Sequence, residues 1–191
     1  MDLRSKIILI YGPTASGKSN FAIKLAKKLN GEIINADSMQ VFKEFKILSS
    51  RPSIRDTQKI KHHLYGVISV KRYFSAGDWL KEVRKKVDVC LKRKKIPIVV
   101  GGTGLYFNTI TKGISKIPDI DLKTRNKVRK LYKKLGFKKF YSLLIKLDPK
   151  IIGRINPTDS QRLQRAYEVK LKTKKSLFDW FANTKSHFSD F

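Results

Sequence analysis

The segment at residues 7–19, which reads IILIYGPTASGKS, restricts the fold of this chain more than any other sequence feature. A short apolar run leads directly into the spacing G-x-x-x-x-G-K-S, the pattern of a phosphate-binding loop between a strand and a helix. Gly12 and Gly17 permit backbone angles and close approaches that a Cβ would obstruct, so amide N–H groups can turn toward an anion. Lys18 adds a positive charge, and the Ser19 hydroxyl can bind a magnesium ion.

The residues that follow this loop have the periodicity of an amphipathic helix, and Asn30-Gly31 supplies a stop signal. The apolar positions at helical spacing are Phe21, Ala22, Leu25, Ala26 and Leu29. A glycine-rich turn that merely connects a strand and a helix would leave Lys18 unexplained. We therefore predict that a diphosphate or nucleotide binds the whole loop, which consists of Gly12, Pro13, Thr14, Ala15, Ser16, Gly17, Lys18 and Ser19.

Strand and helix patterns alternate as far as Gly113, which predicts an α/β fold with a P-loop NTPase-like parallel sheet core. Further strands are expected at residues 32–35 and 96–100, and residues 64–70 are expected to form another strand or a strand-like segment. Residues 76–94 are expected to form a helix whose inward side chains are Trp79, Leu80, Val83, Val87 and Leu91.

Beyond Gly113 the strand signal ends, and a basic, helical pattern follows. The chain therefore divides into a P-loop α/β core at residues 1–113, a basic helical appendage at 114–178, and a tail at 179–191. Asp159 or Ser160 is expected to cap a long final helix. Residues 186–191 are expected to be frayed.

The chain carries 43 Lys and Arg residues against 15 Asp and Glu, a formal net charge of +28. This excess favours a polyanionic partner. Lys123, Lys127, Lys130 and Lys134 form a stripe at helical spacing that could follow a phosphate backbone, while Val128, Leu131 and Leu135 would pack inward. The alternative, a positive charge spread over every solvated face, stays open.

Length and cysteine content restrict the class of protein further. A chain of 191 residues can bury one core with a small subdomain, and its apolar runs are too short to span a bilayer. Cys90 is the only cysteine, which excludes an internal disulfide and is consistent with the cytoplasm. His62-His63 is rejected as a metal site, because adjacent strand side chains point apart and no cysteine or acidic cluster is expected beside them.

Asp37 directly follows the expected strand at residues 32–35. Ligands of open α/β sheets bind outside the carboxyl ends of the strands, so Asp37 is expected to face the same crevice as Lys18. The strand at residues 96–100 ends in Gly-Gly-Thr without an acidic residue, so it offers backbone amides and the Thr103 hydroxyl. Two glycine-rich turns at one crevice could bind the diphosphate of a ligand. Such a site does not by itself indicate an enzyme that transfers a phosphoryl group.

Five sequence blocks together resemble the tRNA dimethylallyltransferases, also called tRNA isopentenyltransferases, of the IPP transferase family. The blocks are GPTASGKS, DSMQV, HHL, IPIVVGGTGLYF and NPTDSQRLQRAYEV, between Lys6 and about Ser176. Shikimate kinases and adenylate kinases share only the first block. The resemblance implies transfer of a dimethylallyl group from dimethylallyl diphosphate to N6 of the adenosine 3′ of the anticodon in tRNA, with release of diphosphate.

The resemblance also implies roles for particular residues. Asp37, Lys18 and Thr103 would be catalytic, with Asp37 as the base that removes a proton from the adenine amine. The loop would bind the departing diphosphate, together with Mg²⁺ at Ser19. Asp37 could instead cap a helix or support a magnesium ligand. The implied tRNA contacts are Asp37, Ser38, Met39, Gln40, Thr103, Arg125, Gln161, Arg162, Leu163, Gln164 and Arg165. Ser38 to Gln40 would line a pocket for a flipped base, whereas Arg125 could equally be an ordinary solvated residue.

Some positions depart from the family pattern, among them Phe42, Glu44 and the tract from Leu48 to Pro52. Family members normally continue past residue 191, so the resemblance implies a chain shortened at its C-terminus. Two other functions stay open: an isopentenyltransferase that acts on free adenine nucleotides, and a catalytically inactive, nucleotide-dependent RNA-binding protein. We expect a cytoplasmic monomer that does not contact a membrane.

Overall fold

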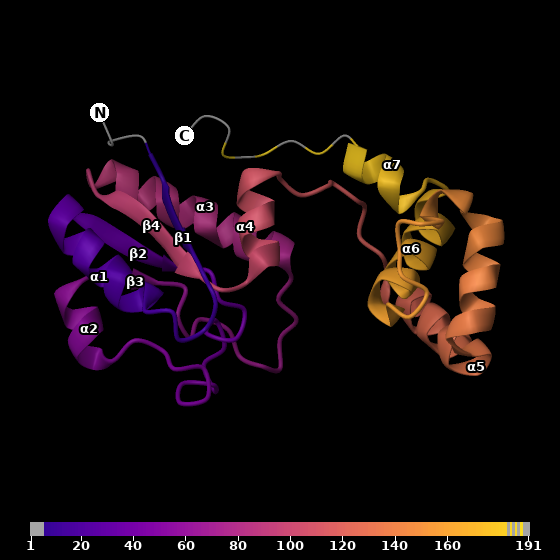
Figure 1. Cartoon of the computed structure of the whole chain (residues 1–191), viewed down its shortest axis with the longest axis horizontal. Helices are drawn as coiled ribbons and strands as arrows, with labels where there is room; N and C mark the ends of the chain where they lie inside the picture. The colour runs from indigo at the N-terminus through magenta and orange to yellow at the C-terminus, as the bar shows by residue number, and fades with distance from the viewer. Residues whose placement is uncertain (1–5, 183, 185, 187, 189–191) are drawn as a thin grey trace. The chain divides into compact units, whose positions relative to one another are not determined.

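The computed structural model describes residues 6–182 together with 184, 186 and 188, and the chain forms two compact units (Figure 1). The first unit lies within Met1–Gly113 and Ser186–Phe191, and the second lies within Ile114–Lys185. None of the described helices is both long enough and apolar enough to cross a membrane.

The first unit contains a four-stranded parallel sheet, which confirms the predicted α/β core. Its strands are β1 (Ile8–Tyr11), β2 (Gly31–Asn35), β3 (His62–His63) and β4 (Ile96–Gly101), and their order is β1-β4-β2-β3. Tyr11 pairs with Gly101, and Asn35 pairs with Val100. The carboxyl ends of β1, β4 and β2 therefore meet at one edge, with the end of β4 in the middle.

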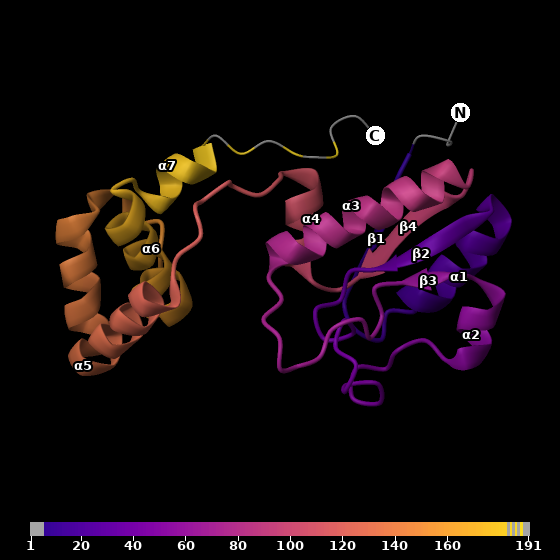
Figure 2. The same cartoon turned by 180° about the vertical axis from the view of Figure 1, so that it is seen from behind.

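Helices α1 (Lys18–Leu29) and α3 (Ala76–Lys92) cover opposite faces of this sheet (Figure 2). Ile33 of β2 packs in the α1 cluster, whereas the side chain of the preceding residue, Glu32, contacts Cys90 of α3. Successive strand side chains point to opposite faces, so the two helices sandwich the sheet. The buried members of the α1 cluster are Ala22, Ala26, Ile33, Ile60, Ile98 and Val100.

Helix α3 confirms the helix predicted at residues 76–94, but one inward position differs. Trp79, Val83 and Val87 are buried as expected, and the next buried side chain is Cys90, whereas Leu91 is only half-buried. Each step of four residues overshoots a full helical turn by about 40°, so a step of three is needed to return to the buried face. Helix α4 (Gly104–Thr111) packs beside α3, where the Tyr106 ring stacks on Trp79 at 4.0 Å.

The start of α3 is a capping box, in which the Ser75 hydroxyl accepts from the Asp78 amide and the Asp78 carboxylate accepts from the Ser75 amide. We expect Ser75→Ala to lower the free energy of unfolding by about 1 kcal/mol in urea titrations. Hydrogen bonds from Ser75 lower the pKa of Asp78, so the contribution of Asp78 is complete above its unfolded pKa and is lost in acid. Ser142→Ala, in mid-helix on the second unit, is the control and should cost nothing.

The strand predicted at residues 64–70 is wrong. Strand β3 comprises only His62–His63, and the residues after it form a loop in which Ile68 makes an isolated bridge to Phe42. Leu64 and Gly66 have φ values of 63° and 59°. These left-handed conformations end an extended strand, and nothing in the apolar pattern revealed them.

The regular secondary structure in the described part of the second unit is helical. It contains α5 (Leu122–Leu147), the 3₁₀ helix η1 (Pro149–Ile151), α6 (Ser160–Thr173) and α7 (Leu177–Ala182). Asp159 caps α6, as expected, by accepting a hydrogen bond from the Arg162 amide. Gly136, with φ of 67°, kinks α5. The buried core consists of Val128, Phe140, Leu144, Ile151, Ile155, Leu163, Ala166, Val169 and Leu177.

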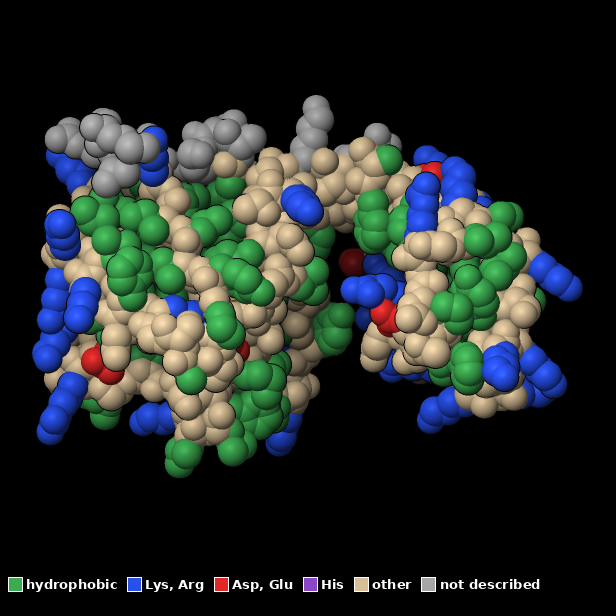
Figure 3. Space-filling model, in the orientation of Figure 1, with side chains coloured by type: hydrophobic (Ala, Val, Ile, Leu, Met, Phe, Trp, Pro, Cys, Tyr) green, Lys and Arg blue, Asp and Glu red, His purple; other side chains and the backbone are tan. Residues whose placement is uncertain are grey.

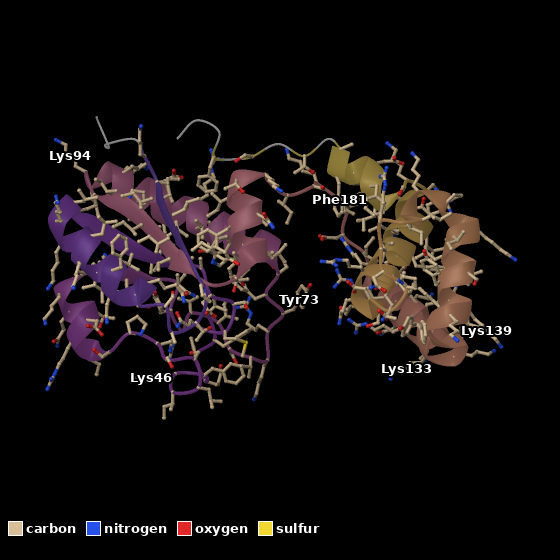
Figure 4. The ribbon with its side chains drawn as sticks, viewed as in Figure 1. Lys46, Tyr73, Lys94, Lys133, Lys139 and Phe181 are labelled. Atoms are coloured by element: carbon tan, nitrogen blue, oxygen red, sulfur yellow. The ribbon has the colours of Figure 1, made fainter. Side chains whose placement is uncertain are left out.

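Helix α5 has the two faces that the sequence predicts. The four lysines of the stripe, Lys123, Lys127, Lys130 and Lys134, are exposed, while Val128 is buried and Leu131 and Leu135 pack against the core. Lys133 and Lys139, on either side of the kink, add to the positive charge of this helix (Figure 4). Lys and Arg side chains also lie on the first unit (Figure 3), so the positive charge of the protein is not confined to the stripe.

The tail expected from residue 179 begins inside α7, which runs from Leu177 to Ala182. The expectation of fraying is wrong for two described residues of the segment 186–191. The Ser186 hydroxyl donates to the carbonyl of Ile110 at 2.6 Å, and Phe188 is buried. Residues 187 and 189–191 lie outside the described part of the chain.

The remaining helix of the first unit, α2 (Ile54–Lys59), follows the long loop after β2.

Candidate active site

The loop between β1 and α1 has the backbone of an anion-binding nest. Ala15 and Gly17 adopt left-handed conformations with φ of 62° and 77°, and Gly17 is the residue that precedes the first turn of α1. The amides that begin a helix lack intrahelical partners, so they are available to an anion. The Lys18 ammonium donates to the Pro13 carbonyl at 2.7 Å and therefore lies over the loop, and Ser19 is exposed on the first helical turn. The other loop positions, Thr14 and Ser16, are also exposed.

The end of β4 joins this loop to the residues that follow β2. A Cβ on Gly102 would lie 3.3 Å from the carbonyl oxygen of Gly12, and one on Gly101 would lie 2.1 Å from that of Ala36. The Thr103 amide also donates to the Ala36 carbonyl at 3.2 Å. The segment from Gly101 to Thr103 thus lies between the phosphate loop and the turn that carries Asp37.

The position of Asp37 is fixed by a buried asparagine that sequence reasoning missed. The Asn35 side chain accepts from the Asp37 amide at 2.9 Å, and it donates to the carbonyls of Asp37 and Leu64 at 2.9 and 3.1 Å. The available signal was a polar residue at the carboxyl end of the strand, directly after two isoleucines. One Asp37 oxygen accepts from the Met39 amide at 2.9 Å. No described helix begins at Asp37, so the helix-cap alternative is wrong.

Thr103 and Ser38 form a second link between the ends of β4 and β2. The Ser38 amide donates to the Thr103 hydroxyl oxygen at 2.9 Å, and the Thr103 hydroxyl lies 3.3 Å from that of Ser38. Met39 is half exposed, while the Gln40 side chain donates to the Ser49 carbonyl at 2.8 Å and so holds the following loop. The structure therefore brings Asp37, Ser38 and Thr103 together.

The buried Tyr106 and the partly buried Tyr65 lie close enough to Asp37 to be affected by its charge. Burial raises the pKa of Tyr106 to about 12 and also raises the pKa of Tyr65, and in both cases the Asp37 carboxylate adds to the increase. Both phenols are therefore protonated at neutral pH. Tyr106 and Phe107 are both buried, so their rings belong to the core of the first unit.

A cavity of about 260 Å³ adjoins the first turn of α1. Its polar lining includes Ser19, Arg51 and Asp56, and Ile23, Ile33 and Val100 add an apolar part, so the cavity offers groups for both an anion and a short hydrocarbon. Arg51 is held by a hydrogen bond to the Lys43 carbonyl at 3.0 Å. The lining residues are Ser19, Asn20, Ile23, Ile33, Ser50, Arg51, Pro52, Ser53, Asp56, His62, Tyr65 and Val100.

The remaining candidate residues belong to the second unit. Arg125 is half-buried on α5, and residues 161–165 form the first turns of α6. Arg162 is exposed and pairs with Asp159 at 2.9 Å, and Arg165 lies 3.6 Å from Glu168.

The side chains of Gln161, Leu163 and Gln164 differ in their accessibility to RNA. Leu163 is fully buried in the helical core, so its side chain cannot form part of an RNA-binding surface and that prediction is wrong. The apolar residues of the motif recur at helical spacing, and this pattern is the sequence signal that Leu163 faces the core. Gln161 is exposed, whereas the Gln164 side chain is half-buried and donates to the Ser160 carbonyl at 3.1 Å.

The premise for rejecting a metal at His62-His63 is also wrong. Glu32 and Cys90, which are distant in the sequence, lie against His63 in the fold. The His62 ring instead contacts the Ile60 carbonyl at 2.7 Å, so the two histidine rings have different partners.

Curated relatives of this chain are named tRNA dimethylallyltransferase. The relative from Pelagibacter ubique (strain HTCC1062) is 60% identical over 190 residues, which cover all of this chain and 61% of the relative. The relative from Ehrlichia canis (strain Jake) is 43% identical, with 94% of this chain and 59% of the relative covered. The chain thus spans about three-fifths of the length of these relatives.

Solved structures give the same assignment. A eukaryotic dimethylallyltransferase described as acting on tRNA is 32% identical with a TM-score of 0.80, over 94% of this chain and 44% of that chain. The full-length tRNA isopentenylpyrophosphate transferase from Bacillus halodurans is 32% identical with a TM-score of 0.58, over 91% of this chain and 57% of that chain. The family model described as IPP transferase matches residues 40–191. Because the matched residues make up most of this chain, the chain belongs to the IPP transferase family.

Proposed function

We propose that this chain carries the catalytic centre of a tRNA dimethylallyltransferase. The reaction would transfer a dimethylallyl group from dimethylallyl diphosphate to N6 of the adenosine 3′ of the anticodon. The proposal rests on one observation: the segment from Gly101 to Thr103 lies against both the phosphate loop and the turn that carries Asp37. An anion nest and a carboxylate at one sheet edge are the two groups that this transfer requires.

In the proposed reaction the allylic C–O bond breaks and the diphosphate leaves with the bonding electrons. The amides of the loop and Lys18 would stabilise the negative charge that develops on the diphosphate oxygens. The adenine N6 lone pair forms the new C–N bond. Asp37 would accept the proton that N6 loses, because its second carboxylate oxygen makes no hydrogen bond to a described residue.

Mg²⁺ suits the residues at the start of α1. The exposed Ser19 hydroxyl lines the cavity beside the loop, so it could hold the ion against a diphosphate oxygen. When bound, the ion would neutralise diphosphate charge. Arg51 in the same cavity would supply a further cation, while Ile23, Ile33 and Val100 would contact the hydrocarbon.

An assay that mixes labelled dimethylallyl diphosphate, unmodified tRNA and AMP tests the proposal. We expect the label to appear in tRNA. Label in AMP would show an enzyme that acts on free nucleotides. Retention of tRNA without any transfer of label would show an RNA-binding protein that lacks the reaction.

Removal of the Lys18 ammonium should weaken diphosphate binding. We expect Lys18→Ala to raise the Kd for inorganic diphosphate about 10- to 100-fold, since a hydrogen bond to a charged group contributes about 1.5 to 3 kcal/mol. Isothermal titration calorimetry measures this change. Lys24→Ala, which removes an exposed lysine from the same helix, is the control. Equal affinities for the parent and Lys18→Ala would contradict the role of the loop.

Arg162 should contribute to the electrostatic part of tRNA binding. We expect Arg162→Ala to reduce the slope of log K against log salt concentration by about 1, as for the loss of one phosphate contact. Lys94→Ala provides the control, because it also removes one positive charge. Lys94 lies in the turn before the amino end of β4, whereas the candidate site lies at the carboxyl end of that strand (Figure 4). A slope equal to that of the parent would remove Arg162 from the tRNA interface.

A further inference from the structure

A buried group of three metal-ligand side chains lies between the sheet and α3. Glu32 is the second residue of β2, His63 ends β3, and Cys90 belongs to the last turns of α3. Their exposed fractions are 6%, 8% and 0%, so bulk water hardly reaches them. Asp37 follows the other end of β2, so this cluster is separate from the candidate active site.

The three potential ligand atoms surround one point. Glu32 Oε2 lies 2.6 Å from His63 Nε2 and 3.6 Å from Cys90 Sγ, and the last two atoms are 4.0 Å apart. A circle through three atoms at these separations has a radius of about 2.0 Å. Zinc lies about 2.0 to 2.2 Å from nitrogen and oxygen ligands and about 2.3 Å from sulfur. An ion just outside the plane of the three atoms therefore requires only small side-chain movements, chiefly a wider separation between Glu32 and His63.

The surroundings are those of a coordination site for a thiophilic divalent cation. Sulfur and imidazole ligands favour zinc over magnesium or calcium, which prefer oxygen. The second oxygen of Glu32 lies 3.7 Å from the Arg93 guanidinium, a partner that can orient the carboxylate. Burial lowers the pKa of His63, so its imidazole is neutral and can act as a ligand. Burial and the Glu32 charge raise the pKa of Cys90 to about 12, so the thiol keeps its proton until a cation displaces it.

We propose that Glu32, His63 and Cys90 bind one Zn²⁺ ion, with water as the fourth ligand. The zinc–sulfur bond forms as the Cys90 thiol releases its proton to solvent. The proton on His63 Nε2, which now faces Glu32, moves to Nδ1 so that Nε2 can bind the ion, and no oxidation or reduction occurs. The ion would tie β2, β3 and α3 together. Strand β3 comprises two residues, so a bond from His63 to the ion would strengthen its attachment to the sheet.

The whole chain, treated with chelator and then loaded with Zn²⁺ or Co²⁺, tests the proposal. We expect one Zn²⁺ per chain after gel filtration, the release of one proton from Cys90, and a rise in Tm with added Zn²⁺. Co²⁺ should give the charge-transfer absorption band that marks a thiolate ligand. This band is a property of the unaltered protein, so it does not depend on the folding of any variant.

Variants then identify the ligands. Cys90→Ser and His63→Gln should each raise the Kd for Zn²⁺ more than about 100-fold, beyond the roughly 10- to 100-fold cost of losing an orienting partner. His62→Gln is the matched control, because its ring contacts a backbone carbonyl and lies outside the cluster. Zinc that binds equally to the parent and Cys90→Ser, or a cobalt complex without the thiolate band, would overturn the proposal. Failure to bind any zinc would show that the cluster is only a hydrogen-bonded core pair beside a thiol.

Discussion

Asp37→Asn is expected to slow dimethylallyl transfer to tRNA by about 10²- to 10⁴-fold, the usual contribution of a general base. Asparagine keeps an oxygen that can accept from the Met39 amide at the position where Asp37 does so now, at 2.9 Å. The turn after β2 should therefore survive, while the group that accepts the N6 proton is lost. Single-turnover transfer of labelled dimethylallyl diphosphate to tRNA measures the effect.

Two further measurements separate catalysis from structure at this position. The Kd of Asp37→Asn for tRNA should stay within about threefold of the parent value, because uncharged polar contacts and the basic surface of the second unit are retained. Asp88→Asn makes the same chemical change on the exposed side of α3 and should not affect transfer. If Asp37→Asn transferred label at the parent rate, Asp37 would not be the base. An equal loss of transfer and of tRNA binding would show that it maintains structure.

Gly101→Ala is expected to destabilise the first unit by about 3 kcal/mol, the upper end of the usual range for an overpacked core. The added Cβ would lie 2.1 Å from the carbonyl oxygen of Ala36 and 2.2 Å from its carbonyl carbon. These are backbone atoms between β2 and Asp37, so no flexible side chain can move aside. Urea unfolding followed by circular dichroism measures the loss.

The neighbouring glycine provides a matched control for this prediction. A Cβ on Gly102 would meet only the Gly12 carbonyl oxygen, at 3.3 Å, so Gly102→Ala should cost less than about 1 kcal/mol. Similar unfolding midpoints for Gly101→Ala and the parent would contradict the close packing of the end of β4 against the Asp37 turn. That packing positions Thr103 next to Ser38, so transfer should decrease together with stability in Gly101→Ala.

Local pattern was sufficient for the features that depend on nearby residues. The phosphate loop, α1, α3 and the cap of α6 each follow from spacing and capping chemistry within about 15 residues, and the structure has all of them. The same kind of reasoning failed after His63, because left-handed backbone at Leu64 has no signature in an apolar run. It also assigned Leu163 to an RNA-binding surface because the residue lies within a motif, whereas helical phase buries it.

The sequence by itself determined the phosphate loop, the alternation of strands and helices, and the family to which the chain belongs, because these reside in contiguous residues. Only the tertiary structure decided that β4 lies between β1 and β2, and that Gly101 at its end and Gly102 after it therefore meet Ala36 and Gly12. It alone also placed Glu32, His63 and Cys90 together, from positions up to 58 residues apart. Strand order and helix packing bring such residues into contact, and no local pattern of side chains encodes those distances.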